Sequence, residues 1–215
     1  MLKTKVKATA ITNLTDARYF AAWGTNWLGF DLQQGSDTYV QPQLVHAIKE
    51  WVDGVEIVGE FDLEPAPEIL TTAKMLGLNV VQLGMFSSVE TAIEVQEQYP
   101  IIKEVVIEKT TTIKDLTTVL EEFAPYALAF LIDFEKNNIH WDDLKNGLPF
   151  DLAPFRSSCA DFPILLALPW SNTDTLEEVL TTIRPYGISL KGGVEEKVGY
   201  KSFDELDKIF EAIEV

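Results

Sequence analysis

Short runs of apolar residues alternate along the chain with longer stretches in which apolar residues recur every three or four positions. The short runs predict β-strands, and the longer stretches predict amphipathic helices. Because the runs are apolar at consecutive positions, they favour a parallel sheet that is covered by helices on its faces. Eight strands are predicted, at residues 5–10, 27–32, 55–61, 79–83, 103–108, 127–133, 163–167 and 188–191.

Helices are predicted between these strands and after the last of them. They cover residues 15–24, 42–51, 67–75, 88–99, 113–123, 173–183 and 202–213. Residues 137–158 have no clean helical period, so we expect an irregular segment there with at most one short helix. No linker interrupts the chain, and eight units leave no room for a second domain. Residues 1–215 are therefore predicted to form a single α/β domain, a closed (β/α)8 TIM barrel rather than an open doubly wound sheet.

Residues 184–206 contain parts from which α/β proteins often build phosphate sites. The last predicted strand ends at Lys191, and the backbone N–H groups of Gly192 and Gly193 can then face a ligand. Ser202 and Glu205 have the spacing of a capping box, which predicts the start of the last helix. An ordinary strand-to-helix connection would have the same pattern, and on this segment alone we prefer that interpretation.

The chain is strongly acidic. It has 17 Lys and Arg residues against 34 Asp and Glu residues, and its formal net charge is −17. This charge argues against a nucleic-acid partner and against an anionic membrane surface, since both require basic patches. It also makes a phosphorylated ligand electrostatically unfavourable unless the pocket is locally positive. We therefore expect a small-molecule ligand, phosphorylated or not, and the composition is also compatible with a protein partner.

The sequence gives little support for a disulfide, a metal site, a nucleotide-binding site or a membrane span. Cys159 is the only cysteine and has no base nearby in the sequence, so we expect a packed thiol and no disulfide. His46 and His140 have no metal-ligand partners at suitable spacing, and nucleotide-binding glycine motifs are absent, so we expect no metal and no cofactor. No apolar run is long enough to span a membrane, and residues 1–11 have no signal-peptide character, so we expect a cytoplasmic protein.

Polar residues stand at the carboxyl ends of most predicted strands, where barrel enzymes carry their active sites. If these side chains point inward, they form a ring that supports either general acid–base chemistry or a site for a hard cation. Crowding in such a ring would raise the pKa of some carboxyl groups. The alternative is that about half of them point outward into loops. The candidates are Thr9, Asp31, Glu60, Gln82, Glu108, Asp133 and Lys191.

The chain resembles the phosphoribosylanthranilate isomerase family over nearly its whole length. Residues 7–13 followed by Asp16-Ala17-Arg18 are similar to the family's K-I-C-G-I-T-N…D-A opening, and residues 184–206 are similar to its P-Y-G-V-D-V-S-S-G-V-E segment. Leu28-Gly29-Phe30, Val80-Val81-Gln82-Leu83 and Ile132-Asp133 match in the same order. The resemblance implies a (β/α)8 barrel and an Amadori rearrangement, in which a cysteine of the first strand is the general base and an aspartate of the sixth strand is the general acid.

Several positions depart from this pattern. The cysteine position is Thr9, whose hydroxyl is far too weakly acidic to act as a base near neutral pH, whereas the acid position is retained as Asp133. The family's arginine after the second strand falls at Thr38, and its histidine after the fourth falls at Gly84 or Met85. The phosphate loops have lost glycines at residues 135–141 and 167–170, although Gly192 and Gly193 remain.

Three hypotheses follow from these departures. The first and preferred one is a barrel that has lost or substantially altered the isomerase activity and keeps a binding or interaction site at its mouth. The second is an enzyme of changed chemistry, in which Asp133 works with Glu108, Asp31 or Lys191. The third is a working isomerase with an unusual base. A mouth plugged by Phe134 and Trp170 would favour the first hypothesis, whereas inward carboxylates around a small-molecule-sized pocket would favour the second.

Overall fold

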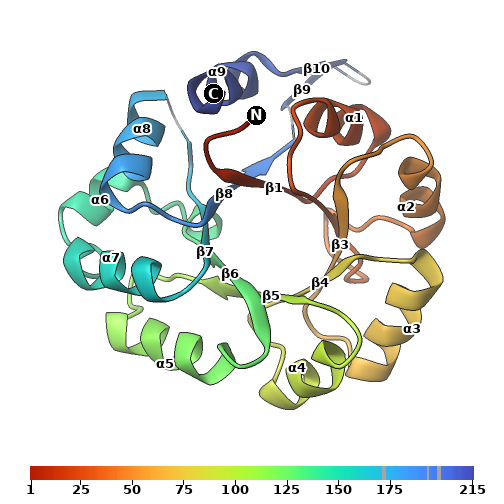
Figure 1. Cartoon of the computed structure of the whole chain (residues 1–215), viewed down its shortest axis with the longest axis horizontal. Coiled ribbons are helices and arrows are strands. Elements are labelled where there is room, and N and C mark those ends of the chain that lie inside the picture. Colours follow the sequence, from red (N-terminus) through yellow and green to blue (C-terminus); the bar gives the residue numbers. More distant parts are fainter. Residues whose placement is uncertain (171–172, 193, 198–199) are drawn as a thin grey trace.

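The computed structural model describes the chain except for residues 171–172, 193 and 198–199. Eight parallel strands close into a barrel in the order in which they occur in the sequence, and helices surround it (Figure 1). Strand β1 closes the barrel by pairing with β8, in a register that sets Lys7 beside Ser189 and Thr9 beside Lys191. The predicted (β/α)8 TIM barrel is therefore confirmed.

The strands lie close to the predicted positions. The barrel consists of β1 (Lys5–Thr9), β2 (Trp27–Asp31), β3 (Glu56–Phe61), β4 (Val80–Leu83), β5 (Ile101–Val106), β6 (Ala127–Asp133), β7 (Ile164–Ala167) and β8 (Gly187–Lys191). Two further strands, β9 (Val194–Lys197) and β10 (Tyr200–Ser202), pair antiparallel after β8. The sequence pattern did not indicate this hairpin.

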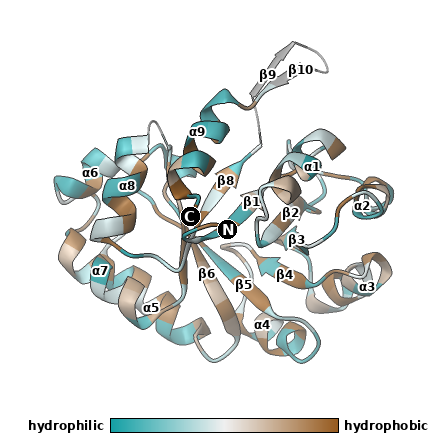
Figure 2. Ribbon diagram, turned by 45° about the horizontal axis from the view of Figure 1, so that its top comes forward, coloured by the Kyte–Doolittle hydropathy of each residue, from teal (hydrophilic) through white to brown (hydrophobic). Residues whose placement is uncertain are grey.

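The helices pack their apolar faces against the outside of the barrel, and hydrophobic and hydrophilic residues alternate along them (Figure 2). Most of the buried apolar residues form this outer layer, and a smaller apolar cluster fills the inside of the barrel. In the described part of the chain, no helix combines the length and apolar character needed to cross a membrane. The helices are α1 (Leu14–Ala22), α2 (Pro42–Lys49), α3 (Ala66–Leu76), α4 (Val89–Gln96), α5 (Ile113–Phe123), α6 (Trp141–Lys145), α7 (Leu152–Asp161), α8 (Thr173–Thr182) and α9 (Asp204–Ile213).

Side-chain caps explain where several helices begin. The Asn13 side chain accepts a hydrogen bond from the backbone of Asp16, and Thr112 forms a full capping box with Asp115 at the start of α5. Helix α3 ends at Gly77, which adopts the left-handed conformation of a C-cap. The capping box predicted at Ser202 and Glu205 is wrong: Ser202 belongs to β10, and α9 begins only at Asp204, without a side-chain cap hydrogen bond.

The segment 137–158 is more ordered than expected. A short 3-10 helix at Glu135–Asn137 follows β6, and α6 and α7 then cover the barrel. Both helices are short or weakly amphipathic, so the hydrophobic pattern was too faint to indicate them. Phe155 of α7 is buried and contacts the rings of Phe134 and Phe150, and this aromatic cluster attaches the segment to the outside of the barrel.

Ala10, the residue directly after β1, has φ of 52°, a conformation that favours glycine. For an alanine this backbone conformation costs about 1 kcal/mol. We expect Ala10→Gly to raise the free energy of unfolding by up to about 1 kcal/mol in denaturant melts. Ala153→Gly, in the exposed part of α7, is the control and should lower it by about 0.5–1 kcal/mol. A loss of stability in both variants would contradict the assignment of strain to Ala10.

Candidate functional site

A layer of polar side chains lies inside the carboxyl end of the barrel. Every second residue of a strand points into the barrel, and the last of these inward residues form the layer. Below it, apolar side chains such as Val58 of β3 and Ile102 of β5 fill the barrel. Two residues further along the same strands, Glu60 and Glu104 are buried at the base of the mouth. A pocket of about 320 Å³ opens above this layer. It is lined by Thr9, Ala10, Asp31, Gln33, Ser36, Thr38, Glu60, Phe61, Asp62, Gln82, Gly84, Glu104, Asp133, Lys136 and Lys191.

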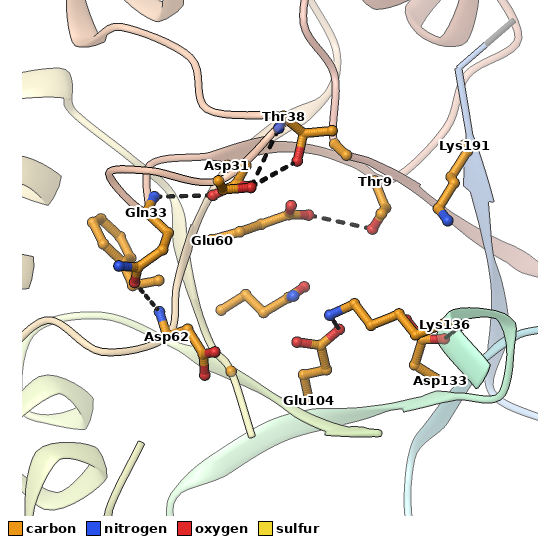
Figure 3. A pocket seen from close by; sticks show the side chains of 15 residues that line it. Thr9, Asp31, Gln33, Thr38, Glu60, Asp62, Glu104, Asp133, Lys136 and Lys191 are labelled. Atoms are coloured by element: carbon orange, nitrogen blue, oxygen red, sulfur yellow. Dashed lines mark hydrogen bonds and ion pairs between the residues drawn. The ribbon is translucent and has the colours of Figure 1, made fainter. Parts of the chain in front are cut away.

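A buried ion pair joins β1 and β3 beneath this pocket. The Lys7 ammonium group lies 2.5 Å from Glu60 Oε1 and 2.5 Å from Thr9 Oγ1, and Lys7 is completely buried. Thr9 Oγ1 also lies 3.2 Å from Glu60 Oε1 (Figure 3). Gly29 of β2 makes this arrangement feasible, because a Cβ at that position would lie only 2.0 Å from Glu60 Oε1 and 2.7 Å from the ammonium nitrogen. The carboxylate therefore occupies space that any other residue at position 29 would fill.

The Asp31 carboxylate at the end of β2 organises the loop that follows it. It accepts hydrogen bonds from the Gln33 backbone at 2.9 Å, from the Thr38 hydroxyl at 2.7 Å and from the Ser36 hydroxyl. Gln33 in turn accepts hydrogen bonds from the backbone after β3, including that of Asp62, so the two loops are connected (Figure 3). Neutral donors thus hold Asp31 on one wall of the mouth.

Across the mouth, Lys136 connects the carboxyl groups of β5 and β6. Its ammonium group lies 2.6 Å from Glu104 Oε1, and its backbone N–H donates to Asp133 Oδ1 at 2.8 Å (Figure 3). Burial raises the pKa of Glu104, and the Asp133 charge adds to this effect, although the Lys136 charge opposes it. Burial alone would lower the pKa of Lys136, but the Glu104 carboxylate reverses this and the pKa is raised. This wall therefore holds two carboxyl groups around one ammonium group.

The structure brings most of the predicted site residues together. Asp133 and Gln82 are buried in the polar layer, and Lys191 lies at the rim, where it pairs with Glu135 at 3.1 Å. Glu108 does not line this pocket. Strand β5 begins and ends two residues earlier than the range 103–108 predicted from the sequence. Glu108 therefore lies two residues beyond the end of β5 and is exposed. The inward position on β5 belongs to Glu104. Those predicted residues that line the pocket are Thr9, Asp31, Glu60, Gln82, Asp133 and Lys191.

Sequence reasoning missed Lys7, Asp62, Glu104 and Lys136. A signal existed for Lys7, because it lies two residues before Thr9 and so on the same face of β1, and it stands beside a glycine-containing strand. Glu104 could have been found in the same way from the alternation with Ile102. Lys136 follows β6 in an irregular turn, so no periodic pattern indicated that its side chain returns to the mouth.

The predicted phosphate elements are not reassembled by the described residues. Gly192 lies against α1, where a Cβ would meet Asp16 Oδ2 at 2.5 Å, so a carboxylate stands next to this glycine. Gly193 lies outside the described residues. A second cavity of about 610 Å³ shares Lys191 with the first, and its described lining includes three carboxylates, Glu135, Asp204 and Glu205, and a second lysine, Lys208. The two lysines supply positive charge for an anion there, and the three carboxylates oppose it.

The mouth is not plugged by the aromatic residues named above. Phe134 is fully buried in the aromatic cluster with α7, and the Trp170 indole donates to the Ser189 backbone carbonyl at 3.0 Å. His46 and His140 are exposed, and burial raises the pKa of Cys159 to about 12. Of the residues that the structure describes, no three His, Cys, Asp or Glu side chains are grouped so that they could hold a metal ion.

Comparisons with known proteins agree with this architecture. A family model described as N-(5'phosphoribosyl)anthranilate (PRA) isomerase matches residues 6–212. An N-(5'-phosphoribosyl)anthranilate isomerase from Gloeothece citriformis is 28% identical, covering 97% of this chain and 93% of its own. The solved phosphoribosyl anthranilate isomerase of Thermus thermophilus is 31% identical, with a TM-score of 0.75 and 97% of each chain covered. Another solved isomerase, in complex with reduced 1-(O-carboxyphenylamino)-1-deoxyribulose 5-phosphate, is 24% identical with a TM-score of 0.77 over 98% of each chain, which shows the common fold.

The contribution of the buried ion pair between Lys7 and Glu60 can be measured from the free energy of unfolding. Lys7→Met would leave Glu60 without its counter-charge, and we expect a loss of about 3 kcal/mol in the free energy of unfolding. The double variant Lys7→Met/Glu60→Gln should lose less stability than Lys7→Met, because it contains no unpaired buried charge. Denaturant melts of the wild type, both single variants and the double variant measure the coupling. A double variant that is less stable than Lys7→Met would contradict this account.

The raised pKa of Glu104 predicts a pH dependence. The folded protein holds this proton at pH values where the unfolded chain releases it, so the stability that Glu104 contributes falls as the pH rises above the ordinary value of 4.5. We expect Glu104→Gln to become progressively more stable relative to the wild type as the pH is raised above 4.5 and through the folded pKa. Denaturant melts at a series of pH values measure the difference. A difference that is constant with pH would contradict the prediction.

Proposed function

Because the chain belongs to the N-(5'-phosphoribosyl)anthranilate isomerase family, we propose that it is an acid–base isomerase of an N-linked sugar. Asp133 is the general acid and Glu60 is the general base. Phosphoribosylanthranilate, the substrate in the names of its relatives, is the first substrate that we assign to it. One observation carries the proposal: Glu60 Oε1 lies 3.2 Å from the Thr9 hydroxyl, the position that the family resemblance assigns to the base.

The two roles follow from the chemistry of an Amadori rearrangement. The acid donates a proton to the ring oxygen as the bond from C1 to that oxygen breaks and the nitrogen lone pair forms a C1=N bond. The base removes the proton from C2 to give an enolamine, and the aminoketose forms as C1 gains a proton and the C2 hydroxyl loses one. A threonine hydroxyl cannot accept the proton from C2 near neutral pH, whereas a glutamate carboxylate can. Asp133 and Glu60 lie on β6 and β3 and line the same pocket, so one substrate could contact both.

The surrounding groups support these roles. The Lys7 ion pair orients the Glu60 carboxylate, and the Lys136 backbone N–H holds one oxygen of Asp133. The other lysine contact, between Lys136 and Glu104, adds a buried carboxyl group with a raised pKa beside the acid. A carboxyl group whose pKa is raised by burial thus lies close to Asp133. Of the three sequence hypotheses, the open pocket with inward carboxylates favours the second, an enzyme of changed chemistry, whereas the family match supports the third, a working isomerase.

A second candidate function is a barrel that binds a small molecule or a protein partner without isomerising phosphoribosylanthranilate. The observation that favours it is the charge of the mouth: among its described lining residues, carboxylates outnumber lysines by five to two. A dianionic substrate would meet repulsion there. In this case the retained Asp133 would be a remnant of the fold.

The assay follows the loss of fluorescence as phosphoribosylanthranilate is consumed. We expect Asp133→Asn and Glu60→Gln each to lower kcat by about 100-fold or more, because each removes one proton-transfer group. Thr9→Val is the matched control on the same hydrogen-bond network, and its kcat should stay within about tenfold of the wild type. Thermal melts of each variant establish that it is folded.

Three results would contradict the proposal. If Glu60→Gln keeps the wild-type kcat, Glu60 is not the base. If Thr9→Val is as damaging as Glu60→Gln, the hydroxyl takes part in catalysis. If the folded wild type does not consume phosphoribosylanthranilate, the second candidate function stands in place of the first.

A further inference from the structure

We propose that the side-chain oxygen of Gln82 accepts a hydrogen bond from the hydroxyl group on C2 of the substrate, the carbon from which Glu60 removes a proton. The inference rests on the proposed function and deepens it, because it names the contact that orients the substrate in the same pocket. Two independent observations carry it: the amide oxygen is buried without a partner, and the strand register sets Gln82 beside Glu60.

The first observation is the state of the Gln82 amide. Gln82 lies on β4 and lines the pocket, although only 4% of the residue is exposed. Its side-chain oxygen Oε1 is buried, and none of the residues that the structure describes donates a hydrogen bond to it. A buried acceptor without a donor destabilises the folded protein, because the oxygen has lost its contact with water and gained no other. A ligand that brings a donor into the pocket would remove this cost.

The surroundings of Gln82 indicate from which side that donor comes. Below it, the inside of the barrel is filled with apolar side chains, including Val80 of the same strand. Two ammonium groups of the site, those of Lys7 and Lys136, are paired with carboxylates, and their described hydrogen bonds do not include Gln82. The donor is therefore expected from the pocket above, where the substrate binds.

The second observation is the register of two neighbouring strands. Glu60 of β3 and Gln82 of β4 are direct partners in the parallel sheet, and both line the pocket. Partners on neighbouring strands lie about 4.8 Å apart. The two side chains have the same length, so their polar ends reach the same depth of the mouth. A carbon atom bound between them can direct its hydrogen toward the carboxylate and its hydroxyl group toward the amide.

This contact supplies an orientation that the base alone does not. Removal of the C2 proton is fast only when the C2–H bond points at the carboxylate, and a weakly polar C–H bond does not fix its own direction. A hydrogen bond from the C2 hydroxyl to Gln82 fixes it. The amide is neutral, so it accepts this bond without adding a negative charge next to Glu60 and Glu104, which both point into the mouth (Figure 3). A neutral acceptor therefore suits an anionic substrate better than a further carboxylate would.

The experiment uses two ligands that differ only in the C2 hydroxyl group. They are the products of reductive amination of anthranilate with ribose 5-phosphate and with 2-deoxyribose 5-phosphate. Both keep the aromatic amine, the phosphate and the other hydroxyl groups, and neither has the ring oxygen that the rearrangement needs, so neither is turned over. In isothermal titration calorimetry at neutral pH, we expect the wild type to bind the C2-hydroxyl ligand at least about tenfold more tightly than the C2-deoxy ligand.

The variant Gln82→Met removes the amide and keeps the length of the side chain. It should lose affinity for the C2-hydroxyl ligand only, so that it binds the two ligands within about threefold of each other. Gln43→Met makes the same chemical change on the exposed side of α2, outside the pocket, and should keep both affinities of the wild type.

Unfolding without ligand distinguishes a binding role from a structural one. Gln82→Met removes a buried acceptor that has no donor, so its urea midpoint should equal or exceed that of the wild type. Gln33→Met makes the same change at a glutamine whose oxygen accepts two backbone hydrogen bonds, and its midpoint should be lower. A lower midpoint in Gln82→Met, together with weaker binding of both ligands, would assign Gln82 to the fold alone.

The remaining outcomes separate this inference from the proposed function. Equal binding of the two ligands by the wild type, or a preference for the C2-hydroxyl ligand that survives in Gln82→Met, would overturn the inference. The acid–base roles of Asp133 and Glu60 would then be unaffected, because turnover tests them. If the folded wild type binds neither ligand, the proposed substrate is wrong and the inference falls with it.

Discussion

The ion pair between Lys7 and Glu60 is the constraint around which the mouth of this barrel is built. Two charged side chains can remain inside a barrel only if each compensates the other and their other hydrogen-bonding atoms find partners. Thr9 supplies such a partner, and Ser189 of β8 contacts Thr9 in turn at 3.2 Å. Gly29 of β2 leaves the space. Strands β1, β2, β3 and β8 therefore all depend on one electrostatic contact.

The same contact decides where chemistry can occur. The Lys7 ammonium group keeps the Glu60 carboxylate fixed beside Thr9 at the base of the mouth, and Glu60 still lines the pocket. If Glu60 of β3 is the base of the reaction, Lys7 of β1 provides its counter-charge. Thr9 fits this arrangement, because its hydroxyl is small and polar enough to share the space with both charges.

The sequence predicted the fold well because eight apolar runs separated by amphipathic stretches allow few other architectures. It predicted the site less well, because a site depends on register. The fifth strand ends two residues earlier than predicted, and its inward carboxylate, Glu104, stands two residues before that end, so Glu108 was predicted in its place although it does not line the mouth. Lys136 was missed for a different reason: it acts from an irregular turn, where spacing along the chain says nothing about side-chain direction. Lys7 was missed because only the last two residues of each predicted strand were considered.

The carboxylates of the mouth differ in how their charges are compensated. At Glu60 and Glu104, lysines of the chain itself supply the positive charge, and protonation of Glu60 would leave the buried Lys7 ammonium group without its counter-charge. At Asp31, hydroxyls and a backbone N–H supply dipoles only. Dipoles fix the position of a carboxylate without neutralising it, so the remaining potential acts on whatever enters the pocket. The mouth therefore contains two carboxylates that lysines of the protein compensate, Glu60 and Glu104, and one that dipoles alone hold, Asp31, and substitutions on different strands can change the two kinds separately.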